Sequence, residues 1–559
     1  MSNRNFSHKT KRGNPHSVQT QGKARLSYEI LSAIAAAGML VNPYAALAAT
    51  NITDGSGKAY TANNNGAYDI AAQKRNGSNA INKFQKFQLG QNDIANLYFH
   101  TAETPKTEAG NLINFVDTRI DINGTLNSIH NAQIGGNLYF LSPNGMAVGK
   151  TGVINTGSLY VMTPASGSAE EMTYEGLQNR FDGTLQESDA AELLANIQSG
   201  NLAIPLNPSG TITVLGTVNA TNNVKMYAPR IAVGKNISGE TLGDTAADGL
   251  ETGAAINTGV TDFTNVVKLT AAQKTAAGLE NKGLKVTAEA GSGDLVLAAK
   301  AEYENVADAE FAESGKNLGL ASAPKTITAS VDSYGTLNAA GSVELKAEAS
   351  NGNYDEAKAE ADAAVDAGTS FGDDTVVADV TSGYAKTIAN VNVQGNITAA
   401  EDVTLTASAN NTYVDTGDSV AGKAEEYASY VLAEGADVAL LENQAAITIG
   451  SGARVQGKHV NVTADAQTEA VIGVEAEGKK ASQNISALIP SAAVNYAQVK
   501  NTAQVTVDGT LTATGADTTT TDEENKTVTN PTLQVTANAA SSVTNKASIK
   551  VESGVLPVK

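Results

Sequence analysis

"GNITAAEDVTLTA", residues 395–407, repeats the pattern of "GTLNAAGSVELKA" at 335–347. Each stretch reads Gly, any residue, an apolar residue, any residue, Ala, three variable residues and then apolar-x-apolar-x-Ala. The same pattern occurs in "GTVNATNNVKMYA" (216–228), in "ARVQGKHVNVTA" (453–464, one residue missing), and in "GTLTAT" (509–514) continued by "LQVTANA" (533–539) after a polar insertion. Self-similarity at a fixed period indicates a repeat architecture.

The period is about sixty residues. The second halves begin at Leu284, Val343, Val403, Val460 and Leu533, and the longest step carries the polar insertion. Apolar and polar residues alternate in each half, which is typical of β-strands, and Gly and Asn between the halves suit tight turns. One coil cannot bury its apolar stripe alone, but stacked coils cover one another. We therefore predict an all-β fold, a right-handed parallel β-helix (β-solenoid).

One segment favours a helix within this fold. "DAAELLANI", Asp189 to Ile197, begins with a capping box formed by Asp189 and Glu192, and Gly200 supplies a stop. The segment belongs to a polar insertion that covers about 165–204. The sequence thus predicts a small helical insertion in the solenoid.

A second segment leaves two alternatives open. "EAKAEADAAVDAG" (356–368) has the composition of a helix. It occupies the same place in its repeat as "AEEYASYVLAEGADVALL" (424–441), just before a clear strand. For 356–368 we favour an Ala-rich strand or loop excursion over a helix.

The composition limits both fold and chemistry. Aromatic residues make up 5% of the 559 residues and Trp is absent, so the core must consist of small aliphatic side chains in thin, regular layers. The 41% of hydrophobic residues argues against disorder. The chain has no Cys, which excludes disulfides, thiol nucleophiles and thiolate metal sites. A chain without Cys also suits passage through an oxidising periplasm in the unfolded state.

The first 49 residues are predicted to be a signal peptide. An apolar run from Ile30 to Val41 is too short to span a bilayer, and Pro43 ends it. Small residues follow, so we expect cleavage near Ala48 or Ala49. A basic leader precedes the run and contains Arg4, Lys9, Lys11, Arg12, Lys23 and Arg25.

The charge of the chain limits its partners. Residues 1–49 hold six basic side chains and one acidic one, so their removal takes the net charge from −20 to about −25. Such a surface repels nucleic-acid backbones and anionic membranes. We predict no nucleic-acid partner and no stable membrane insertion.

Catalytic and metal-binding motifs are missing from the sequence. No G-x-S-x-G motif occurs, and "GSGD" (291–294) is not part of a recurring calcium-binding nonapeptide. The acidic pairs Asp373-Asp374 and Glu523-Glu524 suit glycoside cleavage in principle, but exposed loops explain them better. We predict that the chain is not an enzyme and has no cofactor or metal. None of the five His is spaced as a metal pair: His8, His16, His100, His130 and His459.

A turn is predicted within "NLYFLSPNGMAVGKTGVINTGSLYVM" (137–162). Pro143 presets φ for the first central turn position, and Asn144 and Gly145 tolerate left-handed geometry. The hydroxyl of Ser142 can bond back to the turn. Taken alone, these four residues indicate one corner of the solenoid.

Several motifs in order give this region a family resemblance. The stretches 79–99, 120–163 and 193–239 together resemble the N-terminal secretion domain of two-partner-secretion exoproteins, the filamentous-haemagglutinin-like adhesins. The family's Asn-Pro-Asn-Gly appears here as Ser142-Pro143-Asn144-Gly145, followed by the expected Gly-Lys-Thr-Gly-Val-Ile-Asn from Gly149. The family's pair of phenylalanines three apart is present as Phe84 and Phe87. Its Asn-Pro-Asn-Leu motif has no clear counterpart.

The resemblance covers about 65–240 and implies a domain organisation. Residues 50–245 would form the secretion domain, with the insertion 165–204, and residues 246–559 an Ala/Thr/Val-rich repeat stalk. The stalk is similar to those of large adhesins, including the leukotoxin-like filamentous adhesins. Phe84 and Phe87 are expected to pack in the core of the secretion domain. For Ser142–Gly145 two roles stay open, recognition by the export partner and a purely structural corner.

The implied function is a secreted surface adhesin of a Gram-negative-type bacterium. Export would use an outer-membrane transporter whose periplasmic domains bind the secretion domain. The exported rod would bind a receptor on a host or neighbouring cell through many weak contacts. Neither the receptor, the transporter nor the mode of anchoring can be identified from the sequence.

Three other functions are less well supported. A polysaccharide-active β-helix needs carboxylates converging in one groove, and a cytolysin needs an amphipathic or spanning segment, which the sequence does not offer. A self-transporting passenger needs a barrel, but the last hundred residues hold one aromatic residue, Tyr496. The chain ends within its repeat pattern at "KASIKVESGVLPVK", which we interpret as a truncated reading frame or a fragment.

Overall fold

The computed structural model of the protein describes residues 49–168, 172–182, 187–199, 204–237, 250–267, 269–279, 283–303, 325–352, 375–415, 431–478, 491–521, 527–530 and 532–551. All of them belong to one compact unit, Ala48–Lys559. The predicted signal peptide up to residue 48, the stretch 356–368 and the two acidic pairs lie outside the described residues.

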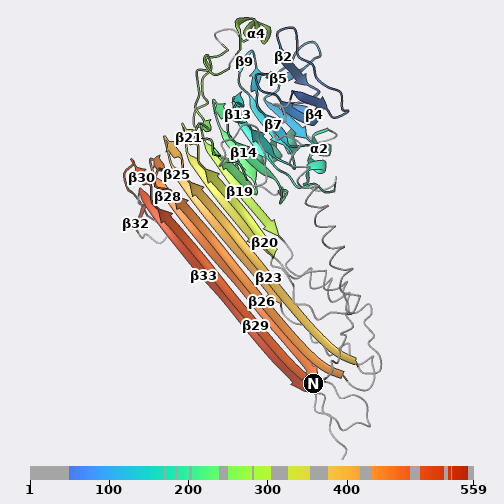
Figure 1. Ribbon diagram of the computed structural model, residues 1–559, viewed down its shortest axis with the longest axis vertical. Coiled ribbons are helices and arrows are strands. Elements are labelled where there is room, and N and C mark those ends of the chain that lie inside the picture. Colours follow the sequence, from blue (N-terminus) through green and yellow to red (C-terminus); the bar gives the residue numbers. More distant parts are fainter. Residues whose placement is uncertain are drawn as a thin grey trace, which may run out of the picture. The chain divides into compact units, whose positions relative to one another are not determined.

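The described strands form a parallel β-helix, as predicted, whose coils have three faces (Figure 1). Each coil contributes one strand to each face, and each strand pairs in parallel with the strand at the same place in the next coil. Faces one and two belong to a 20-stranded sheet, since β4 contributes to both, and face three is the 11-stranded sheet.

Face one consists of β4 (Asn79–Leu89), β6 (Asn111–Val116), β10 (Asn137–Leu141), β13 (Ser158–Met162), β16 (Val224–Ala228), β19 (Leu295–Tyr303), β22 (Val343–Asn351), β25 (Val403–Asp415), β28 (Val460–Gly478) and β33 (Leu533–Val551). Face two consists of the end of β4, β7 (Ile120–Ile122), β11 (Met146–Val148), β14 (Thr211–Val214), β17 (Arg230–Val233), β20 (Lys325–Ser333), β23 (Thr375–Val393), β26 (Val431–Ile449) and β29 (Ser491–Val507).

Face three consists of β2 (Ala67–Ala72), β5 (Ile94–Thr101), β8 (Thr125–His130), β12 (Val153–Thr156), β15 (Thr217–Ala220), β18 (Ala255–Asn257), β21 (Thr336–Ala339), β24 (Asn396–Ala399), β27 (Arg454–Gly457) and β30 (Thr510–Ala513). The remaining strands make antiparallel pairs: β1 (Asn51–Asp54) and β3 (Lys74–Asn76) with β4, β9 (Gln133–Ile134) with β8, and β31 (Thr518–Thr521) with β32 (Thr527–Asn530).

The sequence repeat matches the register of the stack from Val343 onward. Val343 pairs with Val403, Val403 with Val460, and Val460 with Leu533. The first predicted unit, at Leu284, is wrong, because the residue in register with Val343 is Leu295. "LKVTAEA" and "LVLAAKA" fit the pattern equally well and lie eleven residues apart. Leu284 instead packs in a segment that leaves the coil after β18.

No break in the stack marks the predicted boundary between residues 245 and 246. Strand β16 pairs with β19 and strand β17 pairs with β20 across it. The division into a secretion domain and a stalk therefore stays a prediction about function.

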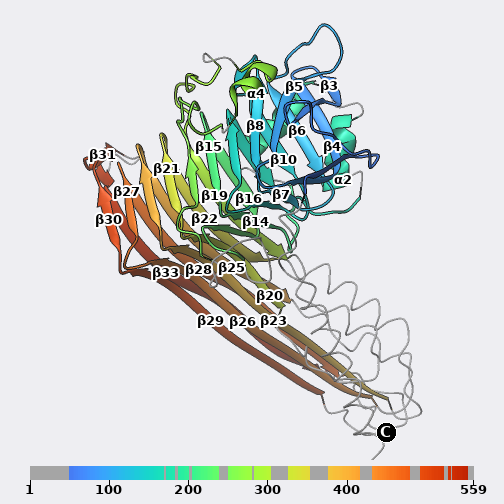
Figure 2. The ribbon, with the colours of Figure 1, turned by 45° about the horizontal axis from the view of Figure 1, so that its top comes forward.

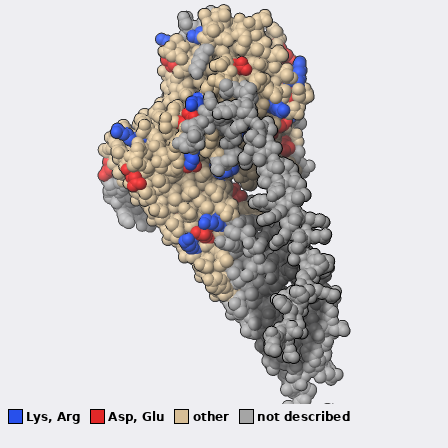
Figure 3. All heavy atoms as spheres, viewed as in Figure 1, with Lys and Arg blue, Asp and Glu red and all other residues tan. Residues whose placement is uncertain are grey.

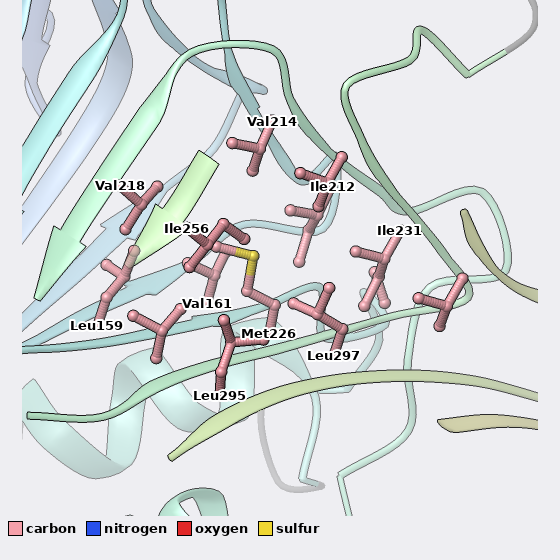
Figure 4. Packing of buried hydrophobic residues seen from close by; sticks show 14 of the residues in the cluster. Leu159, Val161, Ile212, Val214, Val218, Met226, Ile231, Ile256, Leu295 and Leu297 are labelled. Atoms are coloured by element: carbon pink, nitrogen blue, oxygen red, sulfur yellow. The ribbon is translucent and has the colours of Figure 1, made fainter. Parts of the chain in front are cut away.

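The core is one continuous cluster that follows the coil interior from Ile52 to Ala466. Figure 4 shows its middle, where side chains from all three faces converge: Leu159, Val161, Met226, Leu295 and Leu297 from face one, Ile212, Val214 and Ile231 from face two, and Val218 and Ile256 from face three. All of these side chains are buried. Each coil thus covers the apolar stripe of its neighbour.

The strands of faces one and two lengthen along the chain. Strand β10 has 5 residues, whereas β23, β26, β28 and β33 have 19 each and run side by side in Figures 1 and 2. Small inward side chains occur where the strands of face one lengthen, as in the buried Ala347 of β22, Ala407 of β25 and Ala464 of β28. Small side chains let two sheets approach closely, which explains how a chain with few aromatic residues fills this interior. From Val431 on, the Ala-rich stretch 424–441 is strand.

The insertion after β13 contains two helices, α2 (Tyr174–Asp182) and α3 (Glu187–Ser199). The predicted helix Asp189–Ile197 lies within α3, but Asp189 is not its N-cap because the helix begins at Glu187. Gly200 lies outside the described residues. Helix α2 was not predicted: Tyr174, Leu177 and Phe181 have helical spacing, but the segment has only 9 residues and contains Gly176. Both helices bury their apolar side chains against the outer surface of face one.

A third helix, α4 (Ala271–Ala276), lies in the segment between β18 and β19. The capping box of Thr270 and Gln273 starts it. This segment packs Phe263, Val267 and Leu279 against face-three residues such as Ile94 and Ile129. It therefore covers the outer surface of face three in the N-terminal coils.

Candidate functional site at the Ser142–Gly145 corner

The predicted turn is the corner between β10 on face one and β11 on face two. The Gly145 amide donates to the Ser142 carbonyl (3.0 Å), which closes a β-turn. Gly145 has a φ of +82°, so the turn needs a residue without a Cβ there. The Asn144 amide donates to the Ser142 hydroxyl at 3.3 Å, as expected from the sequence.

The preceding coil holds the corner through its backbone. The Ser142 hydroxyl donates to the carbonyl oxygen of Thr118 (2.8 Å), and the Asn144 side chain donates to that of Asp117 (3.0 Å). The Ile120 amide in turn donates to the Gly145 carbonyl (3.0 Å). The corner is thus stacked on the coil below it.

The following coil holds the corner from the other side. The Asn207 side chain donates to the Pro143 carbonyl at 2.9 Å. A Cβ at Gly145 would lie 1.8 Å from the carbonyl oxygen of Thr211, so only glycine allows the two coils to approach. The corner is therefore held by contacts with both neighbouring coils, which favours the structural role for Ser142, Pro143 and Gly145.

Exposure separates one residue of the corner from the other three. Ser142, Pro143 and Gly145 are buried, whereas Asn144 is exposed. A partner that meets the folded corner can therefore reach only the Asn144 side chain and the adjoining backbone. Sequence reasoning treated the four residues as one motif, and only the structure divides them.

Phe84 and Phe87 both lie in the core, as predicted, with 1% and 0% of their surfaces exposed. Residues three apart on a regular strand point to opposite faces. Here β4 contains a β-bulge: Asp54 pairs with Phe84 and Thr53 with Lys86, so Gln85 has no partner on β1. The extra residue returns Phe87 to the inner side.

The phenylalanine pair and the corner belong to one packed unit. The rings of Phe84 and Phe87 lie edge to face with centroids 5.1 Å apart, and Phe87 contacts Phe140 in the same way at 5.6 Å. Phe140 comes two residues before Ser142. Motifs more than fifty residues apart in the sequence therefore meet in the interior of the first coils, although the coil of β6 lies between β4 and β10.

Helix α2 contacts the coil beneath this corner. The Tyr174 hydroxyl donates to the Asp117 carboxylate at 3.0 Å. Burial, reinforced by the charge of Asp117, raises the pKa of Tyr174, so this hydroxyl stays protonated and remains a donor. The insertion is therefore tied to the coil that supports Asn144.

An asparagine ladder, which we did not predict, runs along face three. One asparagine from each of six successive strands donates its side-chain amide to the preceding one, over 2.9–3.1 Å, and the first donates to the Asp69 carboxylate (2.9 Å). The strand pairing places all of them in register. The sequence signal was Asn at the same place in "GTLN", "GTVN" and "AIN". The ladder consists of Asn96, Asn127, Asn155, Asn219, Asn257 and Asn338.

We expect Asn155→Ala to destabilise the fold by about 2–3 kcal/mol. Asn155 is fully buried, and its loss leaves the amide groups of Asn127 and Asn219 each without one buried partner. The midpoint of urea unfolding, followed by far-UV circular dichroism, measures the change. Asn338→Ala is the matched control: it removes a ladder member that is exposed, and should cost less than about 1 kcal/mol. A loss in Asn155→Ala no larger than that in Asn338→Ala would show that burial adds nothing to the stability that the ladder provides.

The charged residues form no concentrated site on the face seen in Figure 3, where blue and red atoms are scattered over a largely uncharged surface. Among the described residues, no three His, Cys, Asp or Glu side chains are placed to hold a metal ion. Within the same residues, no helix has the length and apolar character that crossing a membrane requires.

No family model matches the chain, and no curated protein matches it significantly.

Proposed function

We propose that this protein is a secreted filamentous adhesin, exported across the outer membrane by a dedicated transporter of the two-partner type. The observation that carries the proposal is the contact between Phe87 and Phe140. It joins the phenylalanine pair to the Ser142–Gly145 corner in one packed unit. The residues on which the resemblance to secretion domains rests thus form connected coils at the beginning of the stack.

The stacked coils support export as an unfolded chain. Each strand pairs mainly with the coils directly before and after it, so coils can form in order as the chain emerges. The N-terminal coils leave first in this scheme and offer the later coils a template. The lack of Cys removes the risk of a disulfide that blocks passage.

The corner supplies a specific recognition point in this proposal. Asn144 is its exposed residue, and the backbone of Asp117 and Thr118 holds the corner in place. The transporter's periplasmic domains would contact Asn144 before the coils stack, because Pro143 and Gly145 already favour the turn in the unstacked chain. Ser142, Pro143 and Gly145 would act indirectly, by shaping the corner.

The proposed binding activity follows from repetition. Outward side chains of the long strands can recur from coil to coil, as at Thr406, Thr463 and Thr536, which are neighbours in register. A surface that repeats along a stack can make many weak contacts at once, and their combined strength exceeds that of each contact. The receptor would be a component of a host or neighbouring cell surface.

Fractionation of bacteria that produce the full chain tests the export proposal. We expect the unaltered chain outside the cell, and Asn144→Ala to lower the exported fraction about tenfold, the effect of about 1.4 kcal/mol of lost recognition energy. Asn144→Ala removes one exposed side-chain hydrogen bond, so its urea midpoint should hardly change.

Asn65→Ala is the matched control, since Asn65 is an exposed turn residue outside the motifs. It should be exported like the unaltered chain. If the unaltered chain stays inside cells that also produce an outer-membrane transporter of the two-partner type encoded beside it, the export proposal is wrong. If the chain is exported and Asn144→Ala is exported equally well, the corner is structural only.

A further inference from the structure

A pocket lies outside the corner, where the N-terminal coils meet the segment that carries α4. Its volume is about 450 Å³, within the range of small-ligand sites. Face three supplies Asp69 and Tyr98, the loop after β5 supplies Lys106 and Glu108, and the turn after α4 supplies the opposite side at Gly278. Of these residues, only Tyr98 lies in a stretch that carries the family resemblance, 79–99.

One wall of the pocket is aromatic. Tyr98 and His100 lie on the outer surface of β5 with ring centroids 5.4 Å apart. The Tyr98 hydroxyl donates to the Asp69 carboxylate at 3.2 Å, and the Asn96 amide at the end of the ladder donates to the same oxygen. Burial, followed by the charge of Asp69, raises the pKa of Tyr98, so this hydroxyl stays protonated. The Asp69 carboxylate thus already accepts hydrogen bonds within the protein, and its bond to the Tyr98 hydroxyl fixes the orientation of the Tyr98 ring.

Glu108 contributes an acceptor atom without a partner to the lining of the pocket. Its Oε2 atom is buried and accepts no hydrogen bond. A buried carboxylate oxygen without a donor is costly, because it has lost water without gaining a partner. A ligand that brings an N–H donor into the pocket would remove this cost.

Packed turns fix the opposite side of the pocket. Ala132, which lines it, has a φ of +57°, a strained conformation for a residue with a Cβ. The Ile134 amide donates to the Gly283 carbonyl (3.0 Å), which ties the segment after α4 to the hairpin of Ala132. The pocket is therefore formed by structured elements on each of these sides.

We propose that this pocket binds a primary alkylammonium group, with Glu108 as its hydrogen-bond acceptor and Tyr98 as its aromatic wall. An ammonium group has three donors and no acceptor, which suits a lining whose two carboxylates, Asp69 and Glu108, outnumber its one lysine, Lys106. Its charge is attracted to an aromatic face and to a chain with a net charge of −20. Small side chains, Ala71, Ala102 and Ala277, leave room for the alkyl stem. The site is independent of the proposed export route.

Saturation-transfer NMR with n-butylammonium and the purified full chain tests this site. We expect transfer to the ligand's methylene protons, and an affinity at least about tenfold lower in Glu108→Gln, which keeps the shape but loses the charge. Glu103→Gln is the matched control, because Glu103 is an exposed carboxylate of the same loop that does not line the pocket. It should bind like the unaltered chain.

Two neutral probes, 1-butanol and glucose, test the assigned chemistry. The proposal predicts much weaker transfer to both than to n-butylammonium. Equal binding of 1-butanol would show an apolar cavity, and preferential binding of glucose a sugar site; each result overturns the proposal. Should Glu108→Gln fail to fold, Tyr98→Leu gives a second test, since loss of the ring must also weaken butylammonium binding. Unchanged binding in either folded variant contradicts the assignment.

Discussion

Leu405→Asp is expected to destabilise the long-stranded coils by more than about 4 kcal/mol. Leu405 is fully buried between coils, where Leu345 and Val462 are its neighbours in register. A carboxylate there has neither water nor a partner, and such a buried unpaired charge is among the most destabilising changes known. The adjoining coils should lose their order, because each coil depends on its neighbours.

Urea unfolding followed by far-UV circular dichroism measures this effect, and Thr406→Asp is its control. Thr406 is the next residue, but its side chain points outward and its neighbour in register is Lys346. We expect Thr406→Asp to change stability by no more than about 0.5 kcal/mol. Similar losses in the two variants would mean that the alternation of inward and outward residues in β25 is wrong.

Phe87→Ala is expected to cost about 3–5 kcal/mol, the usual range for removing a buried phenylalanine. The ring is fully buried and contacts both Phe84 and Phe140, so its loss leaves a cavity at the beginning of the stack. Because the corner follows Phe140 directly, we also expect Phe87→Ala to loosen the turn at Ser142. Hydrogen exchange of the Gly145 amide, which is bonded to Ser142, reports on the turn.

Lys86→Ala is the control for this change, since Lys86 is the exposed neighbour of Phe87 in the bulged part of β4. Its stability should stay within about 0.5 kcal/mol of the unaltered chain. A small effect of Phe87→Ala on stability would place Phe87 outside the core. A large effect on stability with unchanged exchange at Gly145 would show that the corner is independent of the phenylalanines.

The repeat in the sequence was sufficient to predict the fold where its pattern is regular. Val343, Val403, Val460 and Leu533 share one register because alternation and spacing leave a single way to stack them. At Leu284 the same reasoning failed, since two stretches carry the same alternation. Only the packing of a complete coil distinguishes Leu295, which joins the stack, from Leu284 in the segment that carries α4.

Local pattern was a weaker guide where tertiary contacts decide. Helix α2 has few apolar residues, yet Leu177 and Phe181 find a ready partner in the outer surface of face one. Helix α3 likewise begins at Glu187, two residues before the predicted N-cap Asp189. Neighbouring residues can also serve as the first residue of a helix, so the sequence alone does not fix its start. Whether these segments form helices, and where the helices begin, depends on the outer surface of face one, which the sequence of the segment itself does not reveal.

In the candidate site, too, some features could be predicted from the sequence and others could not. The turn at Ser142–Gly145 could be predicted from its Pro, Asn and Gly residues. The burial of Phe84 and Phe87 could be predicted from their apolar character. The bulge at Gln85 and the difference in exposure between Asn144 and its neighbours were not readable, because both depend on other coils. The pocket at Glu108 had no signal at all, since its lining comes from segments far apart in the chain.

A pair of introduced cysteines tests most directly whether the coils stack in this register, on which every proposed role depends. The chain has no Cys, and Thr406 and Thr463 are outward-facing partners in register on β25 and β28. Parallel neighbours lie about 4.8 Å apart, within the range that a disulfide spans. We predict that Thr406→Cys with Thr463→Cys forms an intramolecular disulfide on oxidation. Thr406→Cys with Gln467→Cys should not, because the partner is then shifted by four residues, about 13 Å along the strand. Absence of the first disulfide, or equal formation of both, would contradict the stacked solenoid.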